Sequence, residues 1–130
     1  MKLLLDTHIL LWSLLEPERL SESVSSELQN KENELWISPI TVWEIMILER
    51  KKRVRLEPDA ATWIRRVLDR VPFREAKLNR EIAILSCMIN LPHQDAADRF
   101  LAATAAVFDL TLVTADKRLF ESSEYQVLRN

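Results

Sequence analysis

The sequence predicts an α/β fold in which a central parallel sheet of four to five short strands is covered by helices on both faces. Short apolar runs alternate along the chain with longer segments of helical periodicity, and this alternation is typical of right-handed crossover connections. The run Leu3–Leu5 is wholly apolar, as a strand buried on both faces requires. With 130 residues, 48% of them hydrophobic, the chain is long enough to bury the core of a single domain over residues 1–130.

Each expected element has its own local signal. Strands are expected at the apolar or β-branched runs 3–5, 35–37, 72–74, 111–114 and 125–128. Helices are expected over the segments 9–15, 21–30, 39–50, 58–70, 79–90 and 95–108. Ser21, Asn79 and Asp95 are suitable N-cap residues, and Pro39 fits the first turn of its helix. Asn90 is expected to take the left-handed conformation in which glycine usually ends a helix.

The absence of glycine excludes several ligand-binding motifs. The Walker P-loop, the Rossmann fingerprint and the nucleophile elbow of hydrolases all need glycine where the backbone approaches a ligand or turns sharply, and this chain has none. The net charge of −2 provides no global attraction to nucleic acid. Binding of a polyanion would therefore require a local arrangement, such as a metal site.

The amino-terminal residues and the cysteine count bear on the compartment. The chain starts like a signal peptide, but Asp6 and His8 interrupt its apolar run. No apolar stretch approaches the roughly 20 residues of a membrane span. Cys87 is the only cysteine, so an internal disulfide is excluded and a reducing compartment is favoured. We therefore expect a cytoplasmic protein without a membrane segment.

Four acidic residues stand where a hydrophobic chain would not place them by chance. Asp6 directly follows the first strand, and Asp116 follows the strand 111–114. Both would lie at the carboxyl edge of the sheet, where open parallel sheets form their sites. Glu44 is a lone charge inside an apolar helix, and Asp98 lies one turn into the helix that begins at Asp95.

Each acid also has a purely structural interpretation. Asp6 could cap the following helix, Asp98 could support a helix dipole behind the cap Asp95, and Asp116 could be an ordinary turn residue. Glu44 could lie on a solvated stripe. Taken together the four favour a metal site, because we find no obvious cationic partner beside them and clustered carboxylates repel one another. A set of oxygen ligands alone selects Mg²⁺ or Mn²⁺.

Four segments, taken in order along the whole chain, resemble the PIN-domain ribonucleases, and among them the VapC-type toxins of bacterial toxin–antitoxin pairs: Asp6-Thr7-His8-x-Leu10-Leu11-Trp12, Ser38-x₅-Glu44, Leu91-Pro92-His93-x-Asp95-x₂-Asp98-Arg99 and Thr114-Ala115-Asp116. The resemblance implies a PIN-like fold and an Mg²⁺ or Mn²⁺ site built from Asp6, Glu44, Asp98 and Asp116. It makes Asp6 and Asp98 the direct metal ligands. Asp116 and Glu44 would then bind through water, hold a second ion or orient the nucleophile. One departure is Ala96, where such relatives often carry proline.

Other reactive side chains carry weaker signals. His8, His93 and Cys87 lack zinc-ligand spacing, and Cys87 is expected on a packed helix face as a core thiol. Thr7 and Thr114 could bond a carboxylate or a phosphate, or merely satisfy local backbone groups. The basic run 50–55 either follows an RNA backbone or forms a solvated helix end, and the sequence leaves both interpretations open.

The resulting functional hypothesis is a metal-dependent endoribonuclease, the toxin of a type II toxin–antitoxin pair, in which a metal-activated water attacks the scissile phosphate. No serine, cysteine or histidine arrangement supports a covalent intermediate. One alternative is a phosphoacceptor signalling domain, disfavoured because the middle strand is expected to end without an aspartate. The other is a catalytically idle PIN-like protein-binding module.

The expected partners are an RNA substrate, a cognate antitoxin and, by the resemblance, a second copy of the chain in a homodimer. The segments 9–15 and 42–48 are expected to form helices that are apolar around most of their circumference. A helix packed on one sheet face buries only one apolar stripe, so each would have apolar surface left over for an interface. We expect these two helices to form the antitoxin groove, with Trp12 and Trp43 as anchors and the homodimer built mainly from other helices.

Overall fold

The computed structural model describes residues 1–130 and confirms the expected α/β class. Five strands form one parallel sheet in the order β3-β2-β1-β4-β5. The strands are β1 (Lys2–Leu5), β2 (Glu34–Ile37), β3 (Arg74–Glu75), β4 (Thr111–Thr114) and β5 (Gln126–Arg129). The helices are α1 (Thr7–Leu15), α2 (Glu22–Gln29), α3 (Pro39–Arg50), α4 (Ala60–Arg70), α5 (Arg80–Met88) and α6 (Ala96–Phe108), with 3₁₀ turns η1 (Pro17–Arg19) and η2 (Lys117–Leu119).

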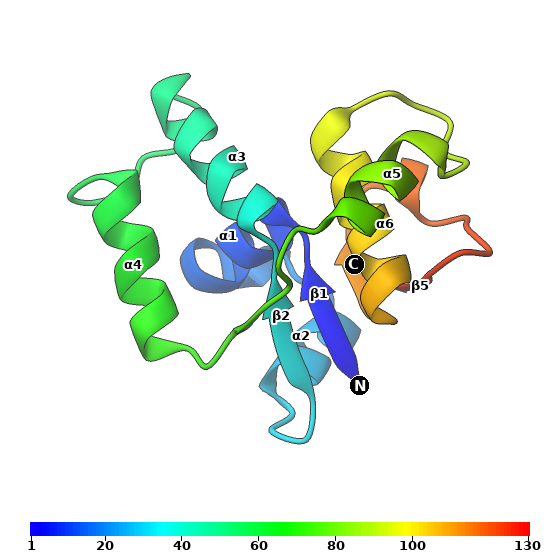
Figure 1. Ribbon diagram of the computed structural model, residues 1–130. Coiled ribbons are helices and arrows are strands. Elements are labelled where there is room, and N and C mark those ends of the chain that lie inside the picture. The colour runs from blue at the N-terminus through cyan, green and yellow to red at the C-terminus, as the bar shows by residue number, and fades with distance from the viewer.

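Helices cover both faces of the sheet, with α1 and α4 on one side and α5 and α6 on the other (Figure 1). Successive side chains of a strand point to opposite faces, so β1 contributes to two separate cores. Leu3 and Leu5 pack with the helices α1 to α4. Leu4, between them, packs with α6 and the carboxyl-terminal segments. All three leucines are at most 1% exposed, which explains why this strand is apolar without interruption.

The predicted helix starts are confirmed at the level of single hydrogen bonds. The side chains of Ser21, Asp59, Asn79 and Asp95 each accept a hydrogen bond from the backbone N–H three residues later. Each cap satisfies a donor that has no partner within the helix. Pro39 occupies the first turn of α3, where its missing N–H costs nothing.

The predicted left-handed turn at Asn90 is wrong. The helix α5 ends at Met88, and Ile89 continues in an extended conformation with φ −61° and ψ 136°. The free carbonyls at this end are satisfied by the buried guanidinium of Arg99, which donates to Ser86 O at 2.7 Å, Ile89 O at 2.5 Å and Cys87 O at 3.4 Å. An arginine from α6 therefore replaces the capping turn that we expected.

Cys87 is exposed, which contradicts its prediction as a core thiol. The buried face of α5 carries Ile82 and Ser86, and Ile89 follows on the same side. Cys87 lies one residue beyond Ser86, and this offset turns it about 100° away from that face. The apolar spacing identified the correct helix face, but it assigned Cys87 to it wrongly.

The strand β1 lies in the middle of the sheet, between β2 and β4. From β1 the chain proceeds outward to β2 and β3, and it then returns to place β4 on the other flank of β1. Sites in open parallel sheets form beyond the carboxyl ends of the strands at such a reversal. Asp6 follows β1, so the expectation of a middle strand without a terminal aspartate is wrong.

We find no helix that is both long and apolar enough to span a membrane.

Arg99 gives the first testable prediction. We expect Arg99→Gln to lower the free energy of unfolding by about 3 kcal/mol, because a shorter amide leaves several buried carbonyls without a donor. Urea denaturation measures this change. As a control, Arg65→Gln on the exposed surface of α4 should change it by less than about 0.5 kcal/mol. Equal effects of the two substitutions would show that the Arg99 hydrogen bonds do not stabilise the fold.

Candidate metal centre at the carboxyl edge of the sheet

The structure brings the four predicted acids into one cavity of about 380 Å³. Asp6 and Asp116 approach it from the ends of β1 and β4, whereas Glu44 comes from α3 and Asp98 from the first turn of α6. The walls include Thr7, His8, Trp12, Asp95, Leu101, Ala115 and Arg118. The convergence expected from the sequence is therefore present, and all four residues lie at the reversal of the sheet.

Asp6 both caps a helix and lines the cavity, so its two interpretations are compatible. Its Oδ1 accepts a hydrogen bond from Ile9 N at 2.9 Å, which begins α1. The residue is only 8% exposed. Burial raises the pKa of Asp6, and hydrogen bonds from the Thr114 hydroxyl and the Ile9 amide partly offset this effect. Asp6 is held rigidly, with its carboxylate at the inner end of the site.

Glu44 is fixed from the neighbouring helix. The hydroxyl of Thr7, the first residue of α1, donates to its Oε1 at 2.5 Å. Burial raises the pKa of Glu44, the Thr7 hydrogen bond lowers it, and the charges of Asp95 and Asp6 raise it further. Of the partners considered for Thr7, the structure shows a carboxylate. The hydrogen bond also joins α1 to α3 at the site.

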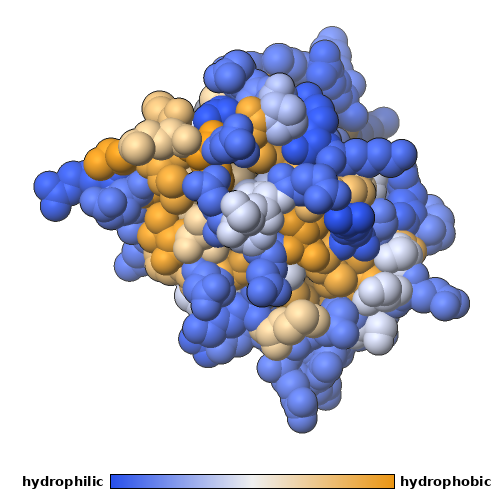
Figure 2. Space-filling model, turned by 90° about the vertical axis from the view of Figure 1, so that its right-hand side faces the viewer, coloured by the Kyte–Doolittle hydropathy of each residue, from blue (hydrophilic) through white to orange (hydrophobic).

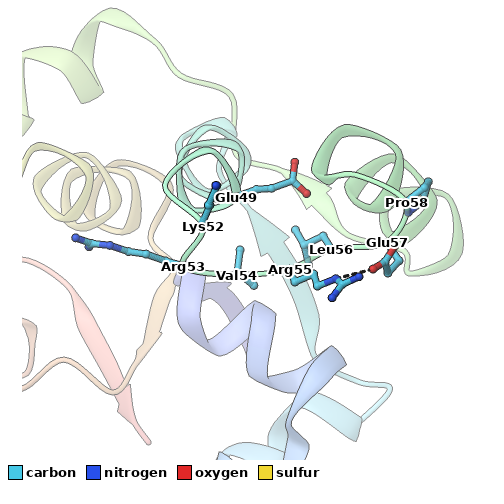
Figure 3. Close-up of a pocket in the computed structure, with 8 residues that line it drawn as sticks. All are labelled: Glu49, Lys52, Arg53, Val54, Arg55, Leu56, Glu57 and Pro58. Carbon is cyan, nitrogen blue, oxygen red and sulfur yellow. Dashed lines mark hydrogen bonds and ion pairs between the residues drawn. The ribbon is translucent and has the colours of Figure 1, made fainter.

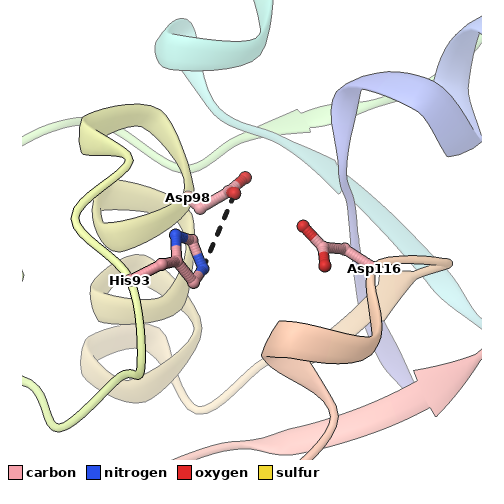
Figure 4. Close-up of side chains that lie close together, drawn as sticks. All are labelled: His93, Asp98 and Asp116. Atoms are coloured by element: carbon pink, nitrogen blue, oxygen red, sulfur yellow. Dashed lines mark ion pairs between the residues drawn. The ribbon is translucent and has the colours of Figure 1, made fainter.

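Asp98, Asp116 and His93 form the tightest group of possible metal ligands, with one ligand atom of each within 4.8 Å of the others. Figure 4 shows Asp98 and His93 on one side of the group and Asp116 facing them. His93 Nδ1 accepts a hydrogen bond from Asp95 N at 3.3 Å, so a neutral ring carries its proton on Nε2. That Nε2 is buried without a hydrogen-bond partner and lies 3.8 Å from Asp98 Oδ2.

The acids do have a cationic neighbour, which corrects the sequence interpretation. Arg118 NH2 lies 2.8 Å from Asp116 Oδ2 and 3.6 Å from Asp98 Oδ2. Its hydrogen bonds hold the pKa of Asp116 below the usual range. Burial, and after it the charges of Asp95, Asp116 and Glu44, together raise the pKa of Asp98 to about 7, with only a small opposing effect of Arg118. Two neighbouring carboxyls thus differ strongly in acidity.

The donor set fits a hard divalent cation. Three aspartates and one glutamate supply carboxylate oxygens, the ligands that Mg²⁺ and Mn²⁺ prefer, and a single arginine does not balance their charge. The buried Nε2 of His93 also lacks a partner in the protein, but in this tautomer it is a hydrogen-bond donor and adds no ligand for a cation. Of the two aspartates predicted as direct ligands, Asp98 belongs to this tight group, whereas Asp6 lies in the same cavity outside it.

Sequence reasoning missed His93 and Arg118. His93 was set aside because no zinc spacing surrounds it, although it stands two residues before the cap of α6. Arg118 follows Asp116 by two residues, a spacing at which a side chain folds back over a 3₁₀ turn. His93 and Arg118 could have been found because each lies within a few residues of a candidate acid, across a turn. Neither helical nor strand periodicity describes such a contact.

Comparison with known proteins agrees with this geometry. The family model described as PIN domain matches residues 3–123. Ribonuclease VapC22 of Mycobacterium tuberculosis is 31% identical over 119 residues, which cover 89% of this chain and 88% of that protein. The crystal structure of VapBC2 from Rickettsia felis bound to a promoter DNA fragment superposes with a TM-score of 0.72 at 17% identity, covering 99% of this chain and 98% of that one. DNA-bound VapBC from Salmonella typhimurium gives 0.68 at 20% identity, covering 99% and 98%.

Asp98 gives a prediction about stability. Between its ordinary value of 3.8 and about 7, the folded state binds a proton that the unfolded state has released, so stability falls as pH rises through this window. We expect Asp98→Asn, which mimics the neutral carboxyl, to raise the melting temperature in EDTA strongly at pH 8 and by a smaller amount at pH 5. Asp69→Asn, on the exposed surface of α4, should have no effect at either pH. A lower melting temperature of Asp98→Asn at both pH values would show that the ionised carboxylate stabilises the fold.

Proposed function

The chain belongs to the PIN domain family, and from this premise we propose that it is an Mg²⁺- or Mn²⁺-dependent endoribonuclease that acts as the toxin of a type II toxin–antitoxin pair. The observation that carries the proposal is the convergence of Asp6, Glu44, Asp98 and Asp116 on one cavity. The ribonuclease relative from Mycobacterium tuberculosis supports RNA as the substrate. We place the activity in the cytoplasm, the compartment expected from the single cysteine.

The residues of the cavity have distinct proposed roles. Asp6 and Asp98 are the direct metal ligands, with Asp116 beside Asp98 in position to complete the set. A bound ion would act as a Lewis acid toward the phosphate and lower the pKa of a nearby water. Glu44, held by Thr7 and with a raised pKa, is suited to accept a proton from the attacking water. Arg118, half exposed at the rim, can contact the phosphate oxygens.

The proposed partners are a cognate antitoxin and a second copy of the chain. Structural neighbours that are VapBC complexes support the antitoxin. The predicted apolar surplus exists, since Leu15 on α1 is 44% exposed and Trp43 on α3 is 54% exposed. Trp12 is partly buried, with Arg19 stacked 4.2 Å above its ring. An antitoxin segment anchored there would have to displace or engage that arginine.

The proposed homodimer has a candidate surface on α5. Ile84 and Met88 are 54% and 74% exposed on this helix. Figure 2 views the side of the molecule on which α5 and β5 lie, and it shows hydrophobic surface among the charged residues of that side. This surface lies away from α1 and α3, as we expected for a dimer built mainly from other helices.

The two alternatives find less support. A phosphoacceptor domain needs an accessible aspartate, whereas Asp6 at the end of the middle strand is buried and caps α1. A catalytically idle binding module would have no reason to keep four carboxylates together against their mutual repulsion. We therefore favour the nuclease.

Loss of the proposed ligands tests the function. We expect Asp6→Asn and Asp98→Asn each to lower RNA cleavage in Mg²⁺ by about a thousandfold or more, because each removes a charge that holds the ion. Both should also abolish the rise in melting temperature that Mg²⁺ produces. Asp69→Asn should leave both measurements unchanged. Full cleavage by the folded Asp98→Asn protein would place the metal ligands elsewhere.

The raised pKa values predict how metal binding depends on pH. Protons compete with the ion for Asp98, whose pKa is about 7, so the apparent dissociation constant of Mg²⁺ should rise about a hundredfold from pH 8 to about pH 5. Isothermal titration calorimetry measures this change, and cleavage at subsaturating Mg²⁺ should fall in parallel. The Asp69→Asn protein, changed outside the cavity, should show the same dependence as the parent. A constant affinity for Mg²⁺ across this range in the parent protein would contradict a site of carboxylates.

A further inference from the structure

A basic turn joins α3 to α4 close to the acid cavity. It carries Lys51, Lys52, Arg53 and Arg55, all exposed. Arg55 is neutralised by Glu57, whose Oε1 lies 2.8 Å from its Nε. Lys51, Lys52 and Arg53 form no ion pair. The turn therefore presents unpaired positive charge in a chain whose net charge is negative.

The backbone of this turn is fixed. Lys52 takes a left-handed conformation with φ 59°, and the N–H of Arg53 bonds back to Leu48 O at 2.9 Å, so the end of α3 closes on itself. Val54 then packs against the core, and Leu56 is only 3% exposed. Arg53 thus stands between two anchored points, and its side chain leaves the surface from a defined position.

Arg53 points away from the Arg55–Glu57 pair. Figure 3 shows the side chain of Arg53 extending on the opposite side of the turn from that pair. There it lines a groove of about 280 Å³ between the carboxyl-terminal half of α3 and the start of α6. We call this the Trp43 groove, after the residue at its other wall, and its polar lining consists of Glu44, Lys51, Arg53 and Asp95. Arg55 does not line it.

The Trp43 groove is continuous with the acid cavity. Glu44 and Asp95 line both spaces, so the groove begins where the cavity ends. An RNA strand that runs outward from the acids would meet Trp43 and the cations Lys51 and Arg53. Trp43 is 54% exposed. An exposed aromatic ring beside unpaired cations matches a nucleotide, which has a π-face and a negative backbone.

We propose that the Trp43 groove holds the nucleotide adjacent to the scissile phosphate, with its phosphate on Arg53 and Lys51 and its base stacked on Trp43. The inference rests on the proposed ribonuclease function and deepens it by naming a substrate subsite. It reassigns Trp43 from the antitoxin, for which the sequence suggested it, to the RNA. Arg53 and Trp43 act as positioning residues, since they contact the substrate away from the reacting phosphate.

Binding of a short fluorescein-labelled single-stranded RNA tests the proposal. Fluorescence anisotropy is measured in Mg²⁺ over a series of salt concentrations, with Asp98→Asn in every protein to prevent cleavage. We expect Arg53→Ala to weaken binding several-fold and to reduce the slope of log K against log salt by ~0.7, the contribution of one phosphate contact on a single strand. Trp43→Ala should weaken binding about tenfold without changing the slope, because stacking releases no counterion.

Matched variants separate these effects from folding and from net charge. Arg55→Ala removes the same charge outside the groove and should leave affinity and slope unchanged, whereas Arg53→Lys should restore the slope. Trp43→Phe should retain most of the affinity, because a smaller aromatic ring still stacks. Equal effects of Arg53→Ala and Arg55→Ala would overturn the proposal. So would loss of antitoxin affinity in Trp43→Ala with RNA affinity unchanged.

The proposed function can fail separately. Cleavage is measured with the parent protein, in which all four acids are intact. If that protein does not cut RNA while Arg53→Ala and Trp43→Ala still weaken binding relative to Arg55→Ala, the Trp43 groove binds RNA and the nuclease assignment falls. If the parent cuts RNA and the three variants bind it equally, the assignment stands and the subsite falls.

Discussion

Mutual repulsion among the carboxylates is the constraint to which the surrounding structure responds. Asp6, Glu44, Asp98 and Asp116 share one cavity, and three of them are each held by a different hydrogen bond. Asp6 is held by the amide it caps, Glu44 by the hydroxyl of Thr7, and Asp116 by the guanidinium of Arg118. Asp98 accepts no hydrogen bond. Its pKa is raised to about 7 because burial and the neighbouring carboxylates both disfavour its charged form. The site is therefore strained electrostatically in a way that a divalent cation would relieve.

The site also depends on a buried arginine that never enters the cavity. The guanidinium of Arg99 closes the end of α5 and also donates to His93 O at 3.0 Å. This hydrogen bond fixes the loop that carries His93 against α6. Asp98 directly precedes Arg99 on that helix. The position of His93 relative to Asp98 is thus set by the hydrogen bond from Arg99 to the His93 carbonyl, together with the hydrogen bond from Asp95 N to the His93 ring. A change at Arg99 would reach the site through this loop.

Most of the fold could be predicted because its signals are local. The apolar strands, the capping residues Ser21, Asn79 and Asp95, and the terminal aspartates of β1 and β4 all follow from short stretches of sequence. The end of α5 could not be predicted, because its carbonyls are satisfied by a side chain that lies ten or more residues later. Arg118 and His93 were missed for a different reason, because their roles arise from a turn and from packing between helices, which periodicity does not describe. The burial of Cys87 was misjudged because a rotation by one residue reverses exposure on a helix.

The order of the strands has a consequence for synthesis. β1 pairs with β4, so that Leu3 lies opposite Thr111, and the two aspartates that follow these strands come from opposite ends of the sequence. A chain still emerging from the ribosome has β1 with one bare edge until β4 has been made, and it lacks Asp116 until after that strand. Closing so long a loop is entropically unfavourable until β4 docks. A product that stops before β4 would therefore be an open sheet with an incomplete site, so the protein gains its chemistry only after β4 and Asp116 have been synthesised.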